Sequence, residues 1–149
     1  MKIVAQNRKA GFNYQFLQTF EAGLVLQGSE VKSLRDGKAN LGDAYALIKN
    51  GEVFLLNCHI SPYPPAAHTN HEPLRTRKLL LHKKEVEKLI GTLQEKGLTL
   101  IPTKLYLKQG RAKVELALAK GKKLFDKRES IKKKESRRAM SRALKFKHR

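Results

Sequence analysis

The chain has 149 residues, which is enough for one domain with a hydrophobic core and an appendage but too few for two ordinary domains. Its 32 Lys and Arg exceed its 13 Asp and Glu, and the formal net charge of +19 indicates a polyanionic partner such as RNA or DNA. The single Cys58 excludes an intrachain disulfide and a paired-cysteine zinc site. No apolar run has the length of a signal peptide or a membrane span, so we expect a cytosolic protein without a membrane partner.

The first predicted strand begins at Tyr14. Apolar side chains fall on its even positions, which are Tyr14, Phe16, Phe20, Ala22, Leu24 and Leu26. A period of two over this length predicts one long strand whose even positions face the core. Gly23 lies inside this strand and would let it coil sharply, as strands do at the corner of a small barrel.

A short helix is predicted after this strand. Ser29 can cap its N-terminus, and the helix would continue to Leu34 or Arg35. Gly37 can then end it in the left-handed conformation that glycine adopts without strain.

Residues 43–60 are predicted to form a hairpin. The apolar runs 44–48 and 53–56 flank Lys49-Asn50-Gly51-Glu52, and the Asn-Gly pair favours a type I′ turn. The following segment, 61–73, contains four prolines. Because each proline pushes the residue before it toward extended geometry, we predict a loop there.

A strand over residues 75–81 and a helix from about Lys83 to Lys96 are predicted to follow, with Gly97 at the helix exit. A second hairpin then pairs residues 98–107 with 111–119 around Lys108-Gln109-Gly110. Its return strand alternates, with Val114, Leu116 and Leu118 predicted to face the core and Lys113 and Glu115 to face outward.

These elements add up to about six strands with two or three helices, and they lack the βαβ regularity of a parallel sheet. We therefore expect residues 1–121 to form a mainly β domain, a closed antiparallel barrel of the OB type with helices at its ends.

The C-terminal segment, residues 122–149, differs from this body in composition. It holds 13 Lys and Arg against three acidic residues, and Ile131 and Met140 fall on opposite sides of a helix. Without an apolar stripe to bury, the tail is predicted to be disordered in the free protein and to become helical when RNA neutralises it. Phe125 could stack on a base, or it could anchor the tail to the barrel together with Leu124, and the residues favour neither role.

The chain lacks the residue patterns of an enzyme. Its carboxylates are scattered over unrelated elements, and it has neither a P-loop nor a dinucleotide fingerprint. His68 and His71 have no Cys or acidic partner at a familiar ligand spacing, so they are predicted to be surface histidines. Cys58 and His59 are neighbours on a strand, which points them to opposite faces and argues against a nucleophile and base pair. We expect a binding protein without a cofactor or a metal.

Several blocks of sequence occur in order along nearly the whole chain. They are Asn7-Arg8-Lys9-Ala10 with Tyr14, Phe20-Glu21-Ala22-Gly23, residues 27–35, Gly37-Lys38-Ala39-Asn40, residues 75–81, and Gly121-Lys122-Lys123 followed by Asp126-Lys127-Arg128. Together these blocks resemble the SmpB family, the SsrA-binding proteins. The resemblance implies a barrel that binds the tRNA-like domain of transfer-messenger RNA and delivers it to ribosomes stalled on messages without a stop codon.

The same resemblance implies further partners. The tail would enter the vacant decoding site and message channel, where it would meet the RNA of the small ribosomal subunit. Elongation factor Tu would belong to the delivery complex, and the free protein would be a monomer.

The resemblance also implies two sets of site residues. The set for transfer-messenger RNA comprises Asn7, Arg8, Glu21, Lys32, Arg35, Lys78, Leu80 and Lys113. The set for the decoding site comprises Gly121, Lys122, Lys123, Phe125, Asp126, Lys127 and Arg128. Many relatives carry His at the position of Phe125, so stacking without hydrogen bonding is the implied role here.

Two alternative functions stay open. A ribosomal protein or ribosomal RNA chaperone would use the barrel and tail on one continuous RNA site, and a metal-dependent nuclease is a more distant possibility.

Overall fold

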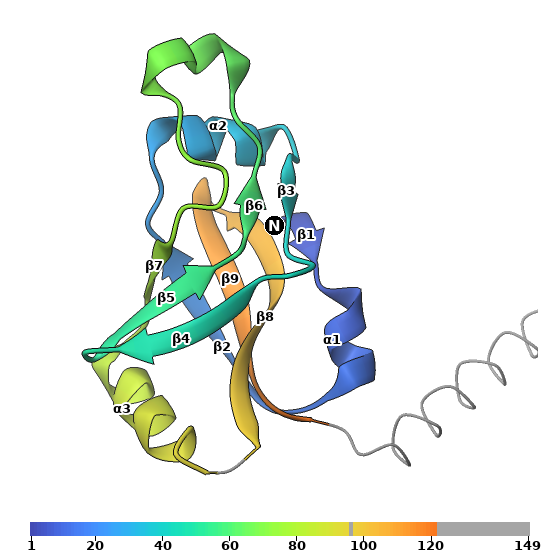
Figure 1. Ribbon diagram of the computed structural model, residues 1–149, viewed down its shortest axis with the longest axis vertical. Coiled ribbons are helices and arrows are strands. Elements are labelled where there is room, and N and C mark those ends of the chain that lie inside the picture. Colours follow the sequence, from blue (N-terminus) through green and yellow to red (C-terminus); the bar gives the residue numbers. More distant parts are fainter. Residues whose placement is uncertain (96, 122–149) are drawn as a thin grey trace, which may run out of the picture.

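The computed structural model of the protein describes residues 1–95 and 97–121 (Figure 1). Lys96 and the C-terminal segment 122–149 lie outside the described residues. The predictions that the tail is disordered when free and helical on the ribosome therefore fall outside this part of the chain. The helix predicted from about Lys83 to Lys96 is shorter than predicted, because it ends at Thr92.

Six strands close into one antiparallel ring. Around the ring they are β8 (Leu98–Lys108), β4 (Tyr45–Lys49), β5 (Glu52–Leu56), β7 (Arg77–Leu80), β2 (Tyr14–Leu24) and β9 (Arg111–Gly121), and β9 pairs back with β8. A further strand, β1 (Lys2–Gln6), pairs with β8, and the short strands β3 (Ala39–Asn40) and β6 (His59–Ile60) pair with each other. The closed antiparallel barrel of the OB type predicted from the sequence is confirmed.

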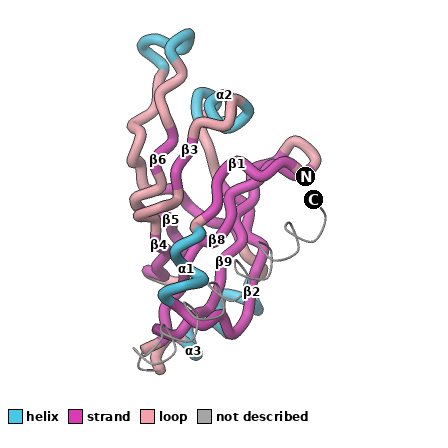
Figure 2. The backbone as a smooth tube through the Cα atoms, turned by 90° about the vertical axis from the view of Figure 1, so that its right-hand side faces the viewer, coloured by secondary structure: helices cyan, strands magenta, loops and turns pink. Residues whose placement is uncertain are grey.

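The described residues contain three α-helices, α1 (Arg8–Asn13), α2 (Gly28–Arg35) and α3 (Lys83–Thr92), and a 3-10 helix at Pro64–Thr69. Figures 1 and 2 show α2 at one end of the barrel and α3 at the other, with α1 against its side. The strand β1 and the helix α1 were not predicted, and the 3-10 helix interrupts the segment predicted to be a loop. None of the described helices is long and apolar enough to cross a membrane.

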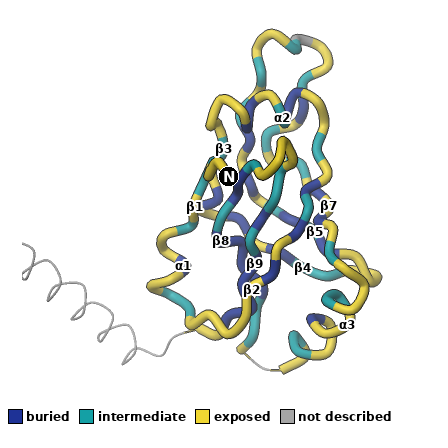
Figure 3. Tube along the Cα trace, turned by 180° about the vertical axis from the view of Figure 1, so that it is seen from behind, coloured by how far each residue is buried: buried dark blue, intermediate teal, exposed yellow. Residues whose placement is uncertain are grey.

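The core lies inside the ring, where the strands alternate between buried and exposed residues (Figure 3). Val114, Leu116 and Leu118 of β9 are buried as predicted, whereas Lys113 and Glu115 lie on the other face. The inner side chains form one cluster with Leu89 of α3. Burial of such side chains contributes most of the free energy that holds a small barrel together.

A β-bulge changes the phase of β2 near its start. Phe16 pairs with Ala119 and Gln18 pairs with Leu118, so one extra residue lies between them. The bulge turns Tyr14 and Phe16 to the outer face, and Tyr14 packs against the small cluster that contains Ala119. The prediction that every even position from Tyr14 faces the core is therefore wrong before the bulge and confirmed beyond it.

The tight turns follow the sequence. Asn50 and Gly51 have φ angles of 53° and 75°, as a type I′ turn requires, so the predicted first hairpin is confirmed. Gln109 and Gly110, with φ angles of 52° and 77°, form the turn of the second hairpin. Gly37, at 74°, ends α2 in the left-handed conformation predicted for it.

The start of α2 differs from the prediction, because Gln27 rather than Ser29 is the N-cap. Ser29 Oγ instead donates to His71 Nδ1 at 2.8 Å. The other ring nitrogen, Nε2, lies 2.8 Å from the carbonyl oxygen of Ile60, which can only accept, so Nε2 donates and Nδ1 accepts. His71 is buried in this chain of hydrogen bonds, and the prediction that it is a surface histidine is wrong.

A buried ion cluster fastens α2 to the barrel. Glu30 of α2 and Arg77 of β7 are both fully buried and form an ion pair, and Arg75 Nη2 donates to Glu30 Oε1 at 2.6 Å. Arg77 Nη1 also donates to the carbonyl oxygen of Cys58 at 2.7 Å. Burial alone would raise the pKa of Glu30, but hydrogen bonds from Arg75, from the backbone of Gln27 and from Arg77 together lower it below its usual value.

Candidate nucleic-acid interface

Four ring strands present a continuous outer face. Leu80 of β7, Gly23 of β2, Lys113 of β9 and Tyr106 of β8 are successive partners in the ladder. Paired residues project on the same side of a sheet, so these four form one row across the strands. Val114, next to Lys113, is buried inside the barrel, and the row therefore points outward. We call this surface of β7, β2, β9 and β8 the outer face.

A second row of charged residues runs beside the first. Glu21 of β2 pairs with Glu115 of β9, which pairs with Lys104 of β8. Lys104 Nζ lies 3.6 Å from Glu115 Oε2, and Lys108 Nζ lies 3.5 Å from Glu21 Oε2. Lys113 has no ion-pair partner among residues 1–95 and 97–121, so its ammonium group is available for an anion such as a phosphate.

Glu21 is exposed but held in place. Tyr106 donates its hydroxyl proton to Glu21 Oε2 at 2.6 Å, and Tyr106 itself is only 6% exposed. The hydrogen bond from Tyr106, with Lys108 and Lys113 nearby, lowers the pKa of Glu21 despite an opposing contribution from burial. Both Tyr106 and Lys108 contact Oε2, which leaves Oε1 to accept from a base amino group or a 2′-hydroxyl.

The sequence prediction did not include Tyr106 or Lys108. Burial raises the pKa of Tyr106 first, and the neighbouring Glu21 raises it further, so the hydroxyl stays protonated and remains a donor. The alternation along β8 could have placed Tyr106 on the outer face. Successive strand residues point to opposite faces, and the neighbouring Leu105 points into the core.

The change Tyr106→Phe is expected to raise the pKa of Glu21 and to weaken RNA binding, on the order of fivefold for one lost hydrogen bond. Carboxylate NMR titration measures the pKa and a filter-binding assay measures the affinity. If Tyr106 acts by positioning Glu21, the same change made in a Glu21→Ala background has no further effect on affinity. Tyr45→Phe, which alters an exposed tyrosine of β4, is the matched control. Additive losses in the double variant would contradict the positioning role.

The structure brings four of the eight predicted body residues together on the outer face, namely Glu21, Lys78, Leu80 and Lys113. Leu80 is 53% exposed and lies beside Gly23, whose bare backbone separates it from Lys113. Lys78 lies two residues before Leu80 on the same face and forms an exposed ion pair with Glu52 at 3.2 Å. The outer face thus combines cations, an exposed apolar side chain and accessible backbone.

The other four predicted body residues lie on other elements. Asn7 caps α1, because its Oδ1 accepts from the backbone of Ala10 at 3.2 Å, and Arg8 is the exposed first residue of that helix. Lys32 and Arg35 are exposed on α2. The ammonium group of Lys32 lies 5.6 Å from the centre of the Tyr63 ring. Arg8, Lys32 and Arg35 are therefore exposed cations outside the row.

Of the predicted decoding-site residues, only Gly121 is described. It ends β9 and pairs with Tyr14 at the start of β2. Lys122, Lys123, Phe125, Asp126, Lys127 and Arg128 lie outside the described residues. The last described residue therefore lies beside the first residue of β2, which directly follows α1.

The described residues offer no grouping of three His, Cys, Asp or Glu side chains that could hold a metal ion. Cys58, just before β6, is buried, and burial raises its pKa to about 11, whereas His59, the first residue of β6, is exposed. The predicted separation of these two side chains is confirmed. A buried, protonated thiol is a poor nucleophile.

A closed barrel whose outer face combines lysines with a positioned hydrogen-bond acceptor is typical of nucleic-acid-binding barrel proteins. The family model described as SmpB protein matches residues 4–146, and the chain belongs to this family.

Relatives and a solved structure agree with this assignment. The chain is 59% identical to the SsrA-binding protein of Trichodesmium erythraeum, over 97% of this chain and 93% of the relative. It is 58% identical to the SsrA-binding protein of Geobacter sulfurreducens, over 98% and 95%, and 59% identical to that of Enterococcus faecalis, over 97% and 94%. A solved structure described as "tmRNA-SmpB: a journey to the center of the bacterial ribosome" is 46% identical, with a TM-score of 0.68 over 85% of this chain and 92% of that chain.

Proposed function

We propose that this protein is an RNA-binding adaptor of trans-translation. Its outer face binds the tRNA-like domain of transfer-messenger RNA, and the protein brings that RNA to stalled ribosomes in the cytoplasm. The observation that carries the proposal is the row of Leu80, Gly23 and Lys113 beside the positioned carboxylate of Glu21. Membership of the SmpB family and the names of the relatives support it.

The outer face suits recognition of a folded RNA by shape. Lys113 can neutralise a phosphate, and the free Oε1 of Glu21 can accept from a 2′-hydroxyl or a base amino group. Leu80 and the bare backbone at Gly23 let a ribose or base approach closely. Folded RNA is recognised mostly through such backbone, hydroxyl and shape contacts rather than through base sequence.

A second RNA site follows at the other end of β9. Lys113 and Gly121 are eight residues apart on this strand, a separation of roughly 25 Å at about 3.3 Å per residue. In the proposal, residues 121–128 enter the vacant decoding site of the small ribosomal subunit, and the remaining tail follows the message channel. This spacing lets the outer face hold one RNA while the tail contacts another. Elongation factor Tu joins the delivery complex, and the free protein is a monomer.

Removal of the single cation Lys113 tests whether the outer face contacts a phosphate of the RNA. Lys113→Ala is expected to weaken binding to the tRNA-like domain and to reduce the slope of log affinity against log salt by about one unit, because one phosphate contact is lost. Filter binding at several salt concentrations measures both quantities. Lys88→Ala removes the same charge from an exposed position on α3 and is the matched control. Equal effects of the two changes would show that only net charge matters and would contradict the proposed contact.

A further inference from the structure

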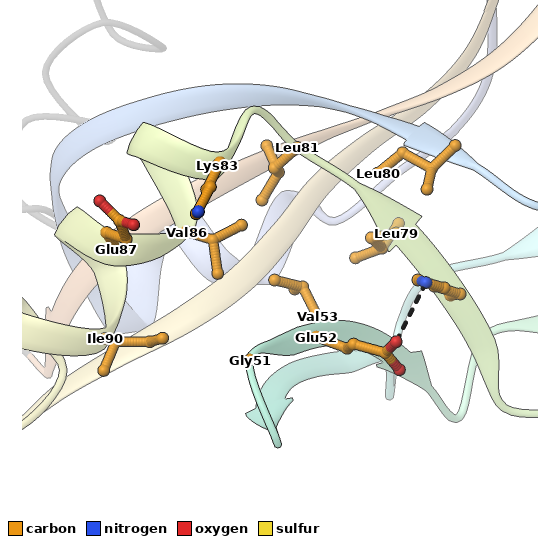
Figure 4. A pocket seen from close by; sticks show the side chains of 11 residues that line it. Gly51, Glu52, Val53, Leu79, Leu80, Leu81, Lys83, Val86, Glu87 and Ile90 are labelled. Carbon is orange, nitrogen blue, oxygen red and sulfur yellow. Dashed lines mark hydrogen bonds and ion pairs between the residues drawn. The ribbon is translucent and has the colours of Figure 1, made fainter.

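A groove lies next to the outer face, between α3 and the strands β5 and β7 (Figure 4). Its volume of about 430 Å³ is within the range of small-molecule sites. Figure 4 shows Val53 of β5, Val86 of α3, and Leu81, which lies between β7 and α3, turned toward one another across the hollow.

The groove has an apolar floor and an apolar mouth. Val53 and Leu79, almost fully buried, form the floor, and the half-buried Leu81 and Val86 form the walls. Ile90 of α3 lies at the mouth with 38% of its surface exposed. Exposed apolar surface of this kind gains free energy when a ligand with an apolar face covers it.

The rim of the groove is charged. Lys83 has no ion-pair partner among the residues that the structure describes. Within residues 1–95 and 97–121, Lys78 is paired only with Glu52, and both side chains are exposed, so the pair contributes little and can be exchanged for a phosphate. Glu87 lies on the same rim, where its carboxylate can accept from an exocyclic amino group.

The groove is continuous with the outer face through one residue. Leu80 belongs to the row with Gly23 and Lys113, and it also lines the groove. The chain passes from Leu80 through Leu81 to Lys83 along the groove edge. An RNA that covers Lys113 and Gly23 therefore also meets the mouth of the groove.

We infer that this groove receives one unstacked nucleobase of the bound RNA, while Lys83 and Lys78 hold the phosphate of the same nucleotide. The inference rests on the proposed function. A nucleobase has two apolar faces and polar edges, which match the apolar walls and the carboxylate of Glu87. Extruded bases are bound between aromatic or apolar side chains, with hydrogen bonds to their polar edges.

A tryptophan that fills the groove tests the inference in the full chain. Val86→Trp is expected to weaken binding to the tRNA-like domain roughly tenfold or more, as loss of a bound base does. Because the base and the phosphate belong to one nucleotide, the salt slope is expected to fall by about one unit. Gln94→Trp places the same side chain in a second groove on the other side of α3 and is the matched control. Thermal unfolding of each variant checks that the barrel is intact.

The outcomes separate the inference from the proposed function. If the wild-type chain does not prefer the tRNA-like domain over ordinary tRNA, the proposed function fails. If the wild type has this preference and Val86→Trp binds equally tightly, the groove holds no base and the inference is overturned. Should Val86→Trp fail to fold, p-benzoylphenylalanine in place of Glu87 is expected to cross-link to a nucleotide, whereas the same residue in place of Gln94 is not. Absence of a cross-link from position 87 overturns the inference as well.

Discussion

A chain truncated after Gly121 is expected to bind the tRNA-like domain but to support no tagging of stalled peptides. Residues 1–121 contain the closed ring and the whole outer face, so the binding surface stays intact. The truncation removes 13 Lys and Arg and, with them, the segment proposed to enter the ribosome. Filter binding with the isolated RNA and a peptide-tagging assay on stalled ribosomes measure the two activities separately.

The full-length Lys113→Ala chain is the reciprocal control, because it keeps the tail and is expected to lose affinity for the RNA. Complete loss of RNA binding on truncation would contradict the division between barrel and tail. It would favour a ribosomal protein or ribosomal RNA chaperone that uses both parts on one continuous site.

Arg77→Ala is expected to lower the free energy of unfolding by about 3–5 kcal/mol, because the fully buried carboxylate of Glu30 loses its buried ion-pair partner and keeps only the partly exposed Arg75. Urea unfolding followed by circular dichroism measures the change. Arg111→Ala, at an exposed position of β9, is the matched control and is expected to change stability by less than about 0.5 kcal/mol. An unchanged urea midpoint for Arg77→Ala would show that the pair does not fasten α2 to the barrel.

The same pair makes stability depend on pH. The pKa of Glu30 is lower in the folded protein than in the unfolded chain, so the stabilisation is present above the unfolded value of about 4.3. It is lost as the pH falls through the folded pKa. Urea unfolding between neutral and acidic pH is therefore expected to show a steeper loss for the wild type than for a Glu30→Gln variant.

The local turns and the barrel could be predicted because short-range chemistry determines them. Asn50 and Gly51 tolerate positive φ angles, and the hairpin they favour is the one observed. The alternation of Val114, Leu116 and Leu118 indicated the inner face of β9 without further information.

The errors arise where long-range contacts override local preference. The bulge between Phe16 and Gln18 reverses the phase of β2, and only the pairing with β9 reveals it. Ser29 is a good N-cap in isolation, but the fold uses its hydroxyl to bind His71, 42 residues away in the chain. Tertiary partners of this kind leave no signal in the local sequence.

Only part of the candidate site could be predicted from the sequence. Strand register alone placed Glu21 and Lys113 on the outer side. The hydrogen bond from Tyr106 that positions Glu21 joins residues 85 apart in the chain, so it required the structure. The groove beside α3 also depends on how Val86 lies against β5 and β7, which helix periodicity does not specify.

Binding of a tRNA-shaped RNA to the outer face of β7, β2, β9 and β8 is the proposal on which the function rests. Its most direct test is an NMR titration of the full chain with the tRNA-like domain at a fixed salt concentration, with amide shifts followed residue by residue. The largest shifts are expected to cluster at Glu21, Gly23, Leu80 and Lys113. Shifts that fall mainly on β4, or that appear equally with ordinary tRNA, would contradict it.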